Sequence, residues 1–321
     1  MLLFRRLAVL SLLSCWNVEA LPSISPDAAV VSNVAALHAA LAKRAPLILL
    51  RSGSTFNGQF IVEHACTIVG ERSGSAPILT NAAFTTSSNV DSATLYLKAK
   101  GMIRLENVHV LNTAEDHNSG QSARGKHPKT PTLAVAVSQS TQAVLVDVKQ
   151  KSWQDTFLCN GLCLLERGSI SGWVDMIYGA GKAFLQGTTI YNRGCGGAIV
   201  AWRSTTGGSV VLNDVNIVRA NDGFADVKDG TCWLARPWAV DSVVVVQNSN
   251  LGTIVNPKLW QANGAGPFSF AKGKTIFAYR GLRGPGYVEQ QVDQSLTHHR
   301  HDFSLYTTPA IYFNGATWAK V

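Results

Sequence analysis

Leu165-Glu166-Arg167-Gly168-Ser169-Ile170 is followed, 20 residues later, by the similar stretch Leu185-Gln186-Gly187-Thr188-Thr189-Ile190. The same spacing of 20 residues separates Asp155, in Trp153-Gln154-Asp155-Thr156, from Asp175, in Val174-Asp175-Met176-Ile177-Tyr178-Gly179. If each repeat is one coil of a stacked sheet, the two carboxylates project from neighbouring strands, about 4.8 Å apart along the stack. One aspartate can then ionise while its neighbour holds a proton.

Short β-rich runs fill most of the remaining chain, bounded by Gly, Asn and Ser. A looser pattern, a polar pair followed by alternating apolar residues, recurs at 106–110, 213–217 and 247–251. Its spacing grows to 27 (186 to 213) and 34 residues (213 to 247), as loop insertions between coils would produce. We predict an all-β, single-domain parallel β-helix, in which each coil buries its inward side chains against its neighbours. An antiparallel sandwich is the weaker alternative, because few Asn-Gly or Asp-Gly turns join paired strands.

Three segments depart from the strand pattern. Residues 27–44 carry apolar residues at helical spacing, which predicts a short helix capping one end of the stack. Residues 116–131 are polar and predict an exposed loop. The tail after Gln294 contains three histidines but no carboxylate or cysteine partner at metal-site spacing, so a solvated tail is favoured over a metal site; they are His298, His299 and His301.

The N-terminus predicts export. Arg5 and Arg6 precede an apolar run, and Val18-Glu19-Ala20 is typical of a cleavage site, so residues 1–20 are read as a signal peptide and 21–321 as the mature domain. The apolar run is too short to span a bilayer, so a secreted, extracellular protein without a membrane anchor is expected. Five cysteines remain after cleavage, an odd number, so at least one stays unpaired. Cys159 and Cys163 either bridge locally or remain buried thiols.

The mature chain is basic. Removal of residues 1–20 leaves 26 Lys and Arg against 19 Asp and Glu, a net charge of +7. An acidic polymer is therefore a natural partner. Nucleic acid is disfavoured because no Lys/Arg cluster is interleaved with aromatics and no zinc-finger spacing is present. An anionic polysaccharide suits an exported protein better.

Three motifs in order carry a family resemblance: Gln154-Asp155-Thr156, Val174-Asp175-Met176-Ile177-Tyr178-Gly179 and Leu234-Ala235-Arg236-Pro237-Trp238. Together they resemble the pectin methylesterases (pectinesterases), a family of carbohydrate esterases. Weaker similarities at 56–62, 67–71, 247–249, 254–257 and 284–286 extend the match over nearly all of the mature chain. The compact form is more similar to microbial members than to plant forms with a long pro-region.

The resemblance implies a right-handed parallel β-helix that hydrolyses the C6 methyl esters of galacturonosyl units in pectin, with no metal and no cofactor. It implies Asp175 as the nucleophile, Asp155 as the general acid/base and Gln154 as an oxyanion donor. Arg236 would be the partner of Asp175. The expected sugar contacts are Trp238, Tyr178, Met176 and Trp153, with packing as an equal alternative for Trp153 and Tyr178. Pectin is the expected partner, and a monomer is expected.

The chemistry of these residue types supports the same roles. A carboxylate is a weak nucleophile and must stay ionised, which a guanidinium in contact favours. A second carboxyl beside that charge tends to keep its proton and can act as a general acid. An amide such as Gln154 donates to an oxyanion without adding negative charge. A serine esterase is disfavoured because the sequence contains no Gly-x-Ser-x-Gly.

The chain departs from the family pattern at a few positions. Leu133 stands where a glutamine precedes Ala-Val-Ala, so a second polar donor is missing. Either Gln139 or a residue of the preceding loop substitutes, or turnover is reduced. Met176 and Tyr178 replace phenylalanines, and Ala235 replaces a glycine. The alternative function is therefore a catalytically impaired β-helix that binds pectin.

Overall fold

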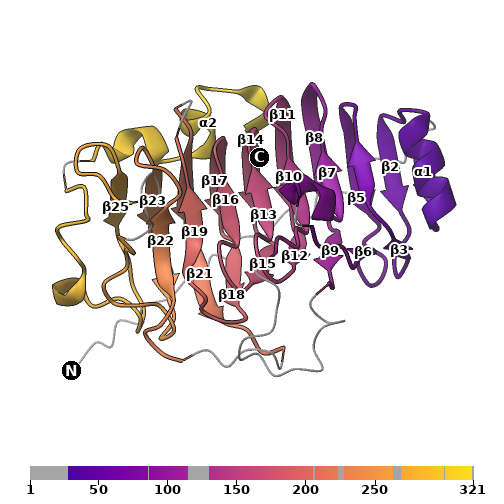
Figure 1. Ribbon diagram of the computed structural model, residues 1–321. Helices are drawn as coiled ribbons and strands as arrows, with labels where there is room; N and C mark the ends of the chain where they lie inside the picture. Colours follow the sequence, from indigo (N-terminus) through magenta and orange to yellow (C-terminus); the bar gives the residue numbers. More distant parts are fainter. Residues whose placement is uncertain are drawn as a thin grey trace, which may run out of the picture.

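A computed structural model describes residues 28–85, 87–114, 130–204, 207–222, 228–262, 269–299 and 301–319. The predicted signal peptide, residues 1–20, lies outside the described residues, as does most of the predicted loop at 116–131. The described chain winds through three sheets in which every strand pair is parallel (Figure 1). The predicted parallel β-helix is thus confirmed.

From β2 to β24, successive strands fall in turn into a ten-stranded, an eight-stranded and a seven-stranded sheet. The ten-stranded sheet contains β1 (Ala29–Val31), β2 (Leu47–Leu50), β5 (Cys66–Gly70), β8 (Gly101–Glu106), β11 (Thr141–Val146), β14 (Leu162–Glu166), β17 (Lys182–Gln186), β20 (Ser209–Asn213), β23 (Val243–Gln247) and β25 (Ile276–Arg280). The eight-stranded sheet contains β3 (Thr55–Asn57), β6 (Ile78–Asn81), β9 (His109–Asn112), β12 (Lys149–Lys151), β15 (Ser169–Gly172), β18 (Thr189–Asn192), β21 (Asn216–Arg219) and β24 (Asn250–Leu251). The seven-stranded sheet contains β4 (Phe60–Val62), β7 (Leu95–Leu97), β10 (Val135–Val137), β13 (Phe157–Cys159), β16 (Ile177–Gly179), β19 (Ala198–Trp202) and β22 (Trp233–Pro237).

The strand register matches the sequence repeats. Leu165 pairs with Leu185 across β14 and β17, and Ile170 pairs with Ile190 across β15 and β18. The longer spacings are also genuine coil offsets, because Gln186 pairs with Asn213 and Asn213 pairs with Gln247. The insertions between these coils therefore lie in the connecting turns and leave the strands in register.

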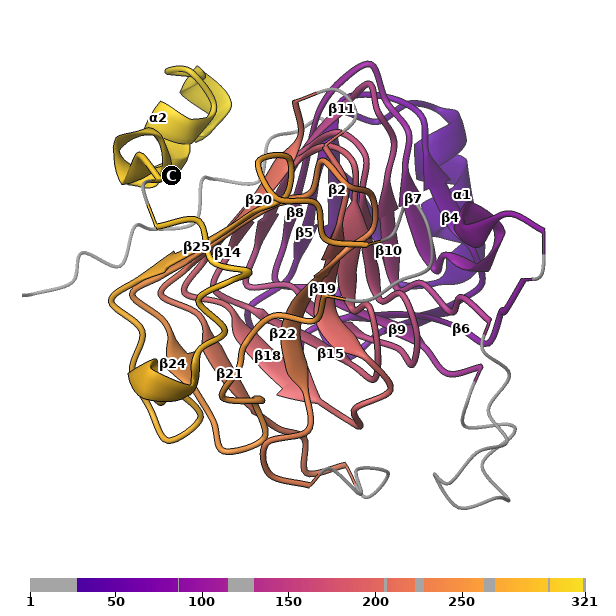
Figure 2. The same ribbon diagram turned by 60° about the vertical axis from the view of Figure 1, so that its left-hand side comes forward.

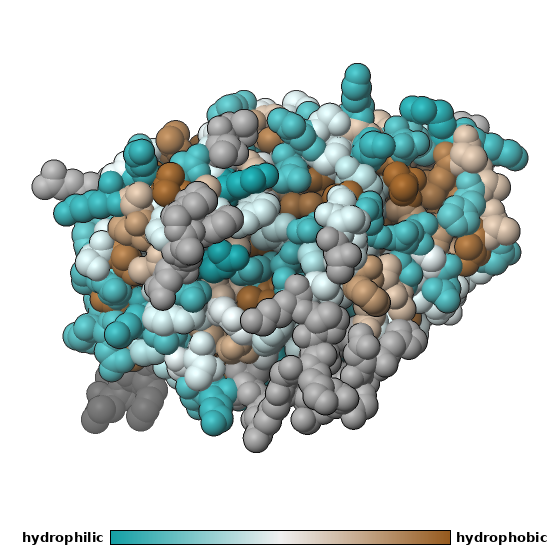
Figure 3. Space-filling view, viewed as in Figure 1, coloured by the Kyte–Doolittle hydropathy of each residue, from teal (hydrophilic) through white to brown (hydrophobic). Residues whose placement is uncertain are grey.

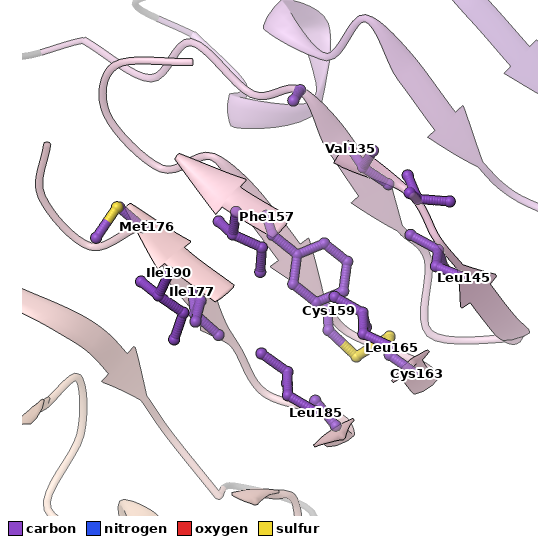
Figure 4. Close-up of a cluster of buried hydrophobic side chains, with 14 of the residues drawn as sticks. Val135, Leu145, Phe157, Cys159, Cys163, Leu165, Met176, Ile177, Leu185 and Ile190 are labelled. Carbon is purple, nitrogen blue, oxygen red and sulfur yellow. A yellow bond between two sulfur atoms is a disulfide. The ribbon is translucent and has the colours of Figure 1, made fainter. Parts of the chain in front are cut away.

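The core is a column of inward-facing apolar side chains that stack from coil to coil. Figure 4 shows one section of it, in which Val135, Phe157 and Ile177 lie on successive strands of one sheet. All three are fully buried. Burial of such side chains contributes about 1.5–3 kcal/mol each, which makes the continuous column the main source of stability.

The turns between the ten-stranded and eight-stranded sheets share one backbone conformation. For the seven strands from β8 to β25 of the ten-stranded sheet, the residue that follows the strand has φ between +52° and +62°; the set is Asn107, Asp147, Arg167, Gly187, Asp214, Asn248 and Gly281. The left-handed region is most accessible to Gly, Asn and Asp, which fill six of these seven positions. The recurrent Asn, Asp and Gly of the sequence pattern therefore mark a corner of the coil.

A helix covers the N-terminal end of the stack. α1 (Val34–Ala42) begins after Asn33, whose side chain accepts a hydrogen bond from the Ala36 N–H, and it buries Leu37 and Ala40 (Figure 1). The predicted helix over 27–44 is too long at its start, because Ala29–Val31 forms β1 instead. This segment pairs in parallel with β2, and edge pairing with a β-branched run outweighs its helical periodicity.

The C-terminal segment packs on the outer face of the ten-stranded sheet, so the predicted solvated tail is wrong. η5 (Phe303–Tyr306), α2 (Pro309–Tyr312) and η6 (Thr317–Ala319) lie to one side of the stack (Figure 2). Tyr312 and Phe313 join outward apolar residues of the sheet, including Phe184, in one cluster. The Tyr312 hydroxyl donates to the Ser209 carbonyl at 2.7 Å. His298 and His299 are nevertheless exposed.

The structure decides between a disulfide and two thiols for Cys159 and Cys163. Cys159 and Cys163 form a disulfide inside the coil (Figure 4), and a second disulfide joins Cys195 and Cys232. Cys66 is the free, buried cysteine, and burial raises the pKa of its thiol to about 11. The predicted unpaired cysteine is thus confirmed. Among the described residues, no helix has the length and apolar character needed to cross a bilayer.

Gly179, the last residue of β16, and Gly187, in the turn after β17, offer a test of the close coil stacking. A Cβ on Gly179, where φ is +154°, would lie 2.0 Å from the Cys159 carbonyl oxygen, whereas a Cβ on Gly187, where φ is +62°, would meet nothing within 4 Å. We expect Gly187→Ala to cost about 1 kcal/mol through left-handed strain alone. Gly179→Ala is expected to cost about 3 kcal/mol or more. Urea denaturation measures both, and equal midpoints would contradict the close approach.

Candidate active site

The two aspartates lie at the corner where the chain passes from the eight-stranded to the seven-stranded sheet. Asp155 precedes β13 and Asp175 precedes β16, with φ of +62° and +50° respectively. A bridge between Gln154 and Val174 and the pairing of Phe157 with Ile177 keep the two turns in register. The sequence spacing of 20 residues therefore stacks the carboxylates on adjacent coils, as predicted.

A guanidinium holds Asp175 from two strands away. Arg236 on β22 donates from Nε to Asp175 Oδ1 at 3.0 Å and from Nη2 to Asp175 Oδ2 at 2.7 Å. The strand between them, β19, places Ala201 opposite both Arg236 and Tyr178. Because this alanine is small, the arginine can reach across β19 to the aspartate. The fork fixes both carboxylate oxygens and favours the ionised acid.

Asp155 lies deeper than Asp175. It is 7% exposed, whereas the side chains of Asp175 and Arg236 are 14% and 21% exposed. Burial, and then the charge of Asp175, raise the pKa of Asp155 to about 8, against smaller opposing effects of Arg236 and of a hydrogen bond from Gln154. Asp155 is thus protonated at neutral pH. Its deeper burial sets it apart from Asp175, whose two oxygens are held by Arg236.

An aromatic group borders the pair. The Tyr178 and Trp238 rings meet edge to face with centroids 5.4 Å apart, and the Arg203 guanidinium lies 4.3 Å from the Trp238 centroid. Trp238 is only half-buried. The face of the molecule seen in Figure 3 shows apolar patches among polar side chains.

Trp153 and Met176 contribute to packing beneath the aspartates. Trp153 is 2% exposed and stacks on Trp173 at 5.1 Å between centroids, with the buried Arg193 guanidinium on its ring at 5.4 Å. Met176 is fully buried and points into the core (Figure 4). Their placement supports the turns that carry the aspartates and offers no exposed surface for a sugar.

Asn89 is a site residue that the sequence does not single out. It begins η1 (Asn89–Ser92), and its Nδ2 donates to Asp155 Oδ2 at 3.2 Å and to the Tyr178 hydroxyl at 3.0 Å. Asn89 lies 66 residues before Asp155 in an irregular segment between β6 and β7. No local motif marks it, because the contact exists only once the coils are stacked.

Leu133, which stands where the family pattern has a glutamine, lies in apolar surroundings. Leu133 is fully buried, and its backbone N–H donates to Ser92 Oγ at 3.1 Å. Gln139, one proposed substitute, is exposed and follows the far end of β10, whereas Asp155 precedes the near end of the adjacent β13. Gln139 therefore lies at the wrong end of the sheet. The other proposed substitute, the preceding loop, is largely outside the described residues.

Comparison with known proteins identifies the family. A family model named Pectinesterase matches residues 61–291. The chain belongs to the pectinesterase family. Its members are carboxylic ester hydrolases, so the protein is an enzyme of that class. Within the described residues, no group of three His, Cys, Asp or Glu side chains could hold a metal ion.

Individual relatives share this assignment. A protein named probable pectinesterase A from Aspergillus niger is 27% identical over 233 residues, which span 70% of this chain and 67% of that protein. Probable pectinesterase A from Aspergillus flavus is 29% identical over 185 residues, 56% of this chain and 52% of the relative. The match thus spans only about half to two thirds of the length of these relatives.

Solved structures show the same fold. The deglycosylated pectin methylesterase from Aspergillus niger has a TM-score of 0.70 at 22% identity, over 92% of this chain and 96% of the other. The pectin methylesterase from carrot has a TM-score of 0.68 at 20% identity, over 85% of each chain. At this identity the likeness establishes the β-helix and leaves the roles of single residues to the geometry above.

Because the pKa of Asp155 is raised, replacing this aspartate by asparagine is expected to stabilise the folded protein at high pH. An unfolded aspartate titrates near about 3.9. Between that pH and about 8 the folded protein keeps a proton that the unfolded chain releases, so the free energy of unfolding falls as pH rises. Asp155→Asn is therefore expected to be more stable than the wild type at pH 8, with a difference that shrinks towards pH 4.

Asp147→Asn is the matched control. Hydrogen bonds from Arg167 and, more weakly, Arg72 lower the pKa of Asp147, so this carboxylate stabilises the fold above the unfolded pKa and loses that effect as pH falls. Its variant should be less stable than the wild type at pH 8. Urea midpoints at several pH values test both variants, and the same sign of change for the two would refute the assignment.

Proposed function

We propose that the protein removes the C6 methyl esters of galacturonosyl units in pectin, giving methanol and pectate. The observation that carries the proposal is the two-bond fork from Arg236 to Asp175 beside a protonated Asp155. Membership of the pectinesterase family supports the substrate class. We further infer that residues 1–20 direct export of a mature domain spanning 21–321, where a basic chain would meet this acidic polymer.

Asp175 acts as the nucleophile. One carboxylate oxygen attacks the ester carbonyl carbon, and the carbonyl oxygen gains the negative charge of a tetrahedral intermediate. Arg236 holds both oxygens of the attacking group and fixes its plane relative to the ester. Gln154, whose amide lies beside Asp155, donates to the developing oxyanion.

Asp155 handles the proton. Its carboxyl donates to methoxide as the C–O bond breaks, which releases methanol and leaves an anhydride between Asp175 and the galacturonosyl carbonyl. The Asp155 carboxylate then takes a proton from the water that attacks this anhydride. Asp175 leaves as a carboxylate and Asp155 ends protonated as it began. The product is released as the C6 carboxylic acid, which loses the second proton of the water to solvent and becomes a carboxylate.

Trp238 binds the sugar chain. Its half-exposed indole adjoins the catalytic corner on the seven-stranded sheet, and a sugar ring can stack on it. The second candidate function, a pectin-binding protein with impaired catalysis, is motivated by one observation. Leu133 leaves one expected amide donor absent.

Methanol release from highly methylated pectin separates the two functions. We expect Asp175→Asn to lower kcat by more than about 10³-fold, because an amide cannot form the anhydride. Asp214→Asn, which alters an exposed carboxylate paired with Arg283, is the control and should retain wild-type turnover. Pectin binding without methanol release by the wild type would refute the esterase and support the binding protein.

The pH profile tests the acid. Because Asp155 must be protonated in the free enzyme, kcat/KM is expected to fall as pH rises through about 8. Methanol release by the Asp175→Asn variant at each pH supplies the background from alkaline hydrolysis of the ester. A kcat/KM that stays constant to pH 9.5 after this subtraction would show that Asp155 does not donate the proton.

A further inference from the structure

We propose that the Tyr178 hydroxyl donates a hydrogen bond to the ester oxyanion, replacing the amide that is absent at Leu133. This inference rests on the proposed esterase function and adds a catalytic residue to it. Tyr178 stands where the family pattern has phenylalanine, a residue that cannot donate. The chain thus loses a donor at one position and gains one at another on the same face.

Leu133 cannot stabilise the oxyanion itself. Its position is in register with that of Asp155, since Val135 pairs with Phe157 two residues later in each coil. The side chain is apolar, and the backbone N–H is already bonded to Ser92 Oγ. The group that should complete a pair of donors with Gln154 must therefore come from elsewhere.

Tyr178 belongs to the same side-chain cluster as Leu133. Its side chain belongs to the outer apolar cluster of the seven-stranded sheet, which also contains Leu133, Leu158 and Ala201. Its strand neighbour Ala201 is also the neighbour of Arg236, so the tyrosine and the catalytic arginine arise from one row of the sheet. The ring is held in this place by Trp238 on one side.

The hydroxyl hydrogen of Tyr178 is free to donate to a substrate. Asn89 has one amide nitrogen with two hydrogens, and it donates to Asp155 Oδ2 and to the Tyr178 oxygen. The latter is the one hydrogen bond of the Tyr178 hydroxyl in the described part of the chain, and the hydroxyl is its acceptor. A phenol that is 3% exposed thus keeps an uncommitted O–H beside the two acids.

The surroundings keep this phenol neutral. Burial first, and then the charge of Asp155 with a smaller contribution from Asp175, raise the pKa of Tyr178 well above its usual value, against an opposing hydrogen bond from Asn89. Asn89, which donates to both Asp155 and the Tyr178 oxygen, places the hydroxyl near the acid. The O–H therefore persists as a neutral donor over the whole pH range in which Asp155 holds its proton.

Sugar stacking is a poor account of Tyr178. The ring is buried, and Trp238 meets it edge to face. Phenylalanine would fill the same space, so the hydroxyl group is the functional difference. Asn89 is the positioning residue, because it fixes the hydroxyl oxygen relative to the Asp155 carboxyl.

Tyr178→Phe is the direct test. The variant restores the family residue, keeps the ring and should fold, which urea denaturation checks. We expect kcat for methanol release to fall about 10²-fold, the usual effect of one lost oxyanion donor, with KM changed by less than about threefold. The alkaline limb of the pH profile should stay in place. A kcat within threefold of the wild type would overturn the inference, and so would a loss explained by a shifted limb.

Two double variants sharpen the test. Leu133→Gln added to Tyr178→Phe should recover at least about tenfold in kcat, because the amide returns to the same oxyanion. No recovery would count against a shared role. Asn89→Ala should lower kcat by a larger factor in the wild type than beside Tyr178→Phe, where only its hydrogen bond to Asp155 remains to be lost, whereas an asparagine that acts independently of the hydroxyl would give additive losses. A wild type that releases no more methanol than Asp175→Asn would instead refute the proposed function itself.

Discussion

In-register parallel stacking is the constraint on which the whole molecule depends. Each strand must satisfy its backbone hydrogen bonds with the coil before and the coil after it, so equivalent residues of successive coils lie one strand spacing apart, about 4.8 Å. Along the core this spacing stacks Phe157 on Ile177, and at the corner it stacks Asp155 on Asp175. The fold thus imposes a proximity of two carboxyls that isolated side chains would avoid, and Arg236 offsets the repulsion.

The stacking also explains which parts of the fold could be predicted. Leu165 and Leu185 occupy equivalent places in two coils without insertions, so their similarity is visible in the sequence. Segments outside the repeating coils are harder to predict from the sequence. Ala29–Val31 has helical periodicity but forms an edge strand, and the C-terminal segment depends on a sheet face that no sequence repeat announces.

The site likewise contains residues that the sequence predicts and residues that it does not. Asp155, Asp175 and Arg236 stand in motifs whose spacing and residue types predicted that they lie together. The sequence does not show which way the Trp153 and Met176 side chains point, because residues beside a positive-φ turn do not follow strand alternation. Both side chains are buried. Asn89 was missed because its contacts arise from irregular chain laid over the sheet.

Burial of the acid links stability to chemistry. A carboxyl that is largely removed from water costs the fold stability once it ionises, and the same burial keeps Asp155 protonated at the pH where the proposed mechanism needs a proton donor. The long apolar column supplies the stability that tolerates such a group. Replacement of a polar side chain by Leu133 extends that apolar environment to the edge of the site. An oxyanion donor there must then be neutral and prepositioned, requirements that a buried phenol held by an asparagine meets.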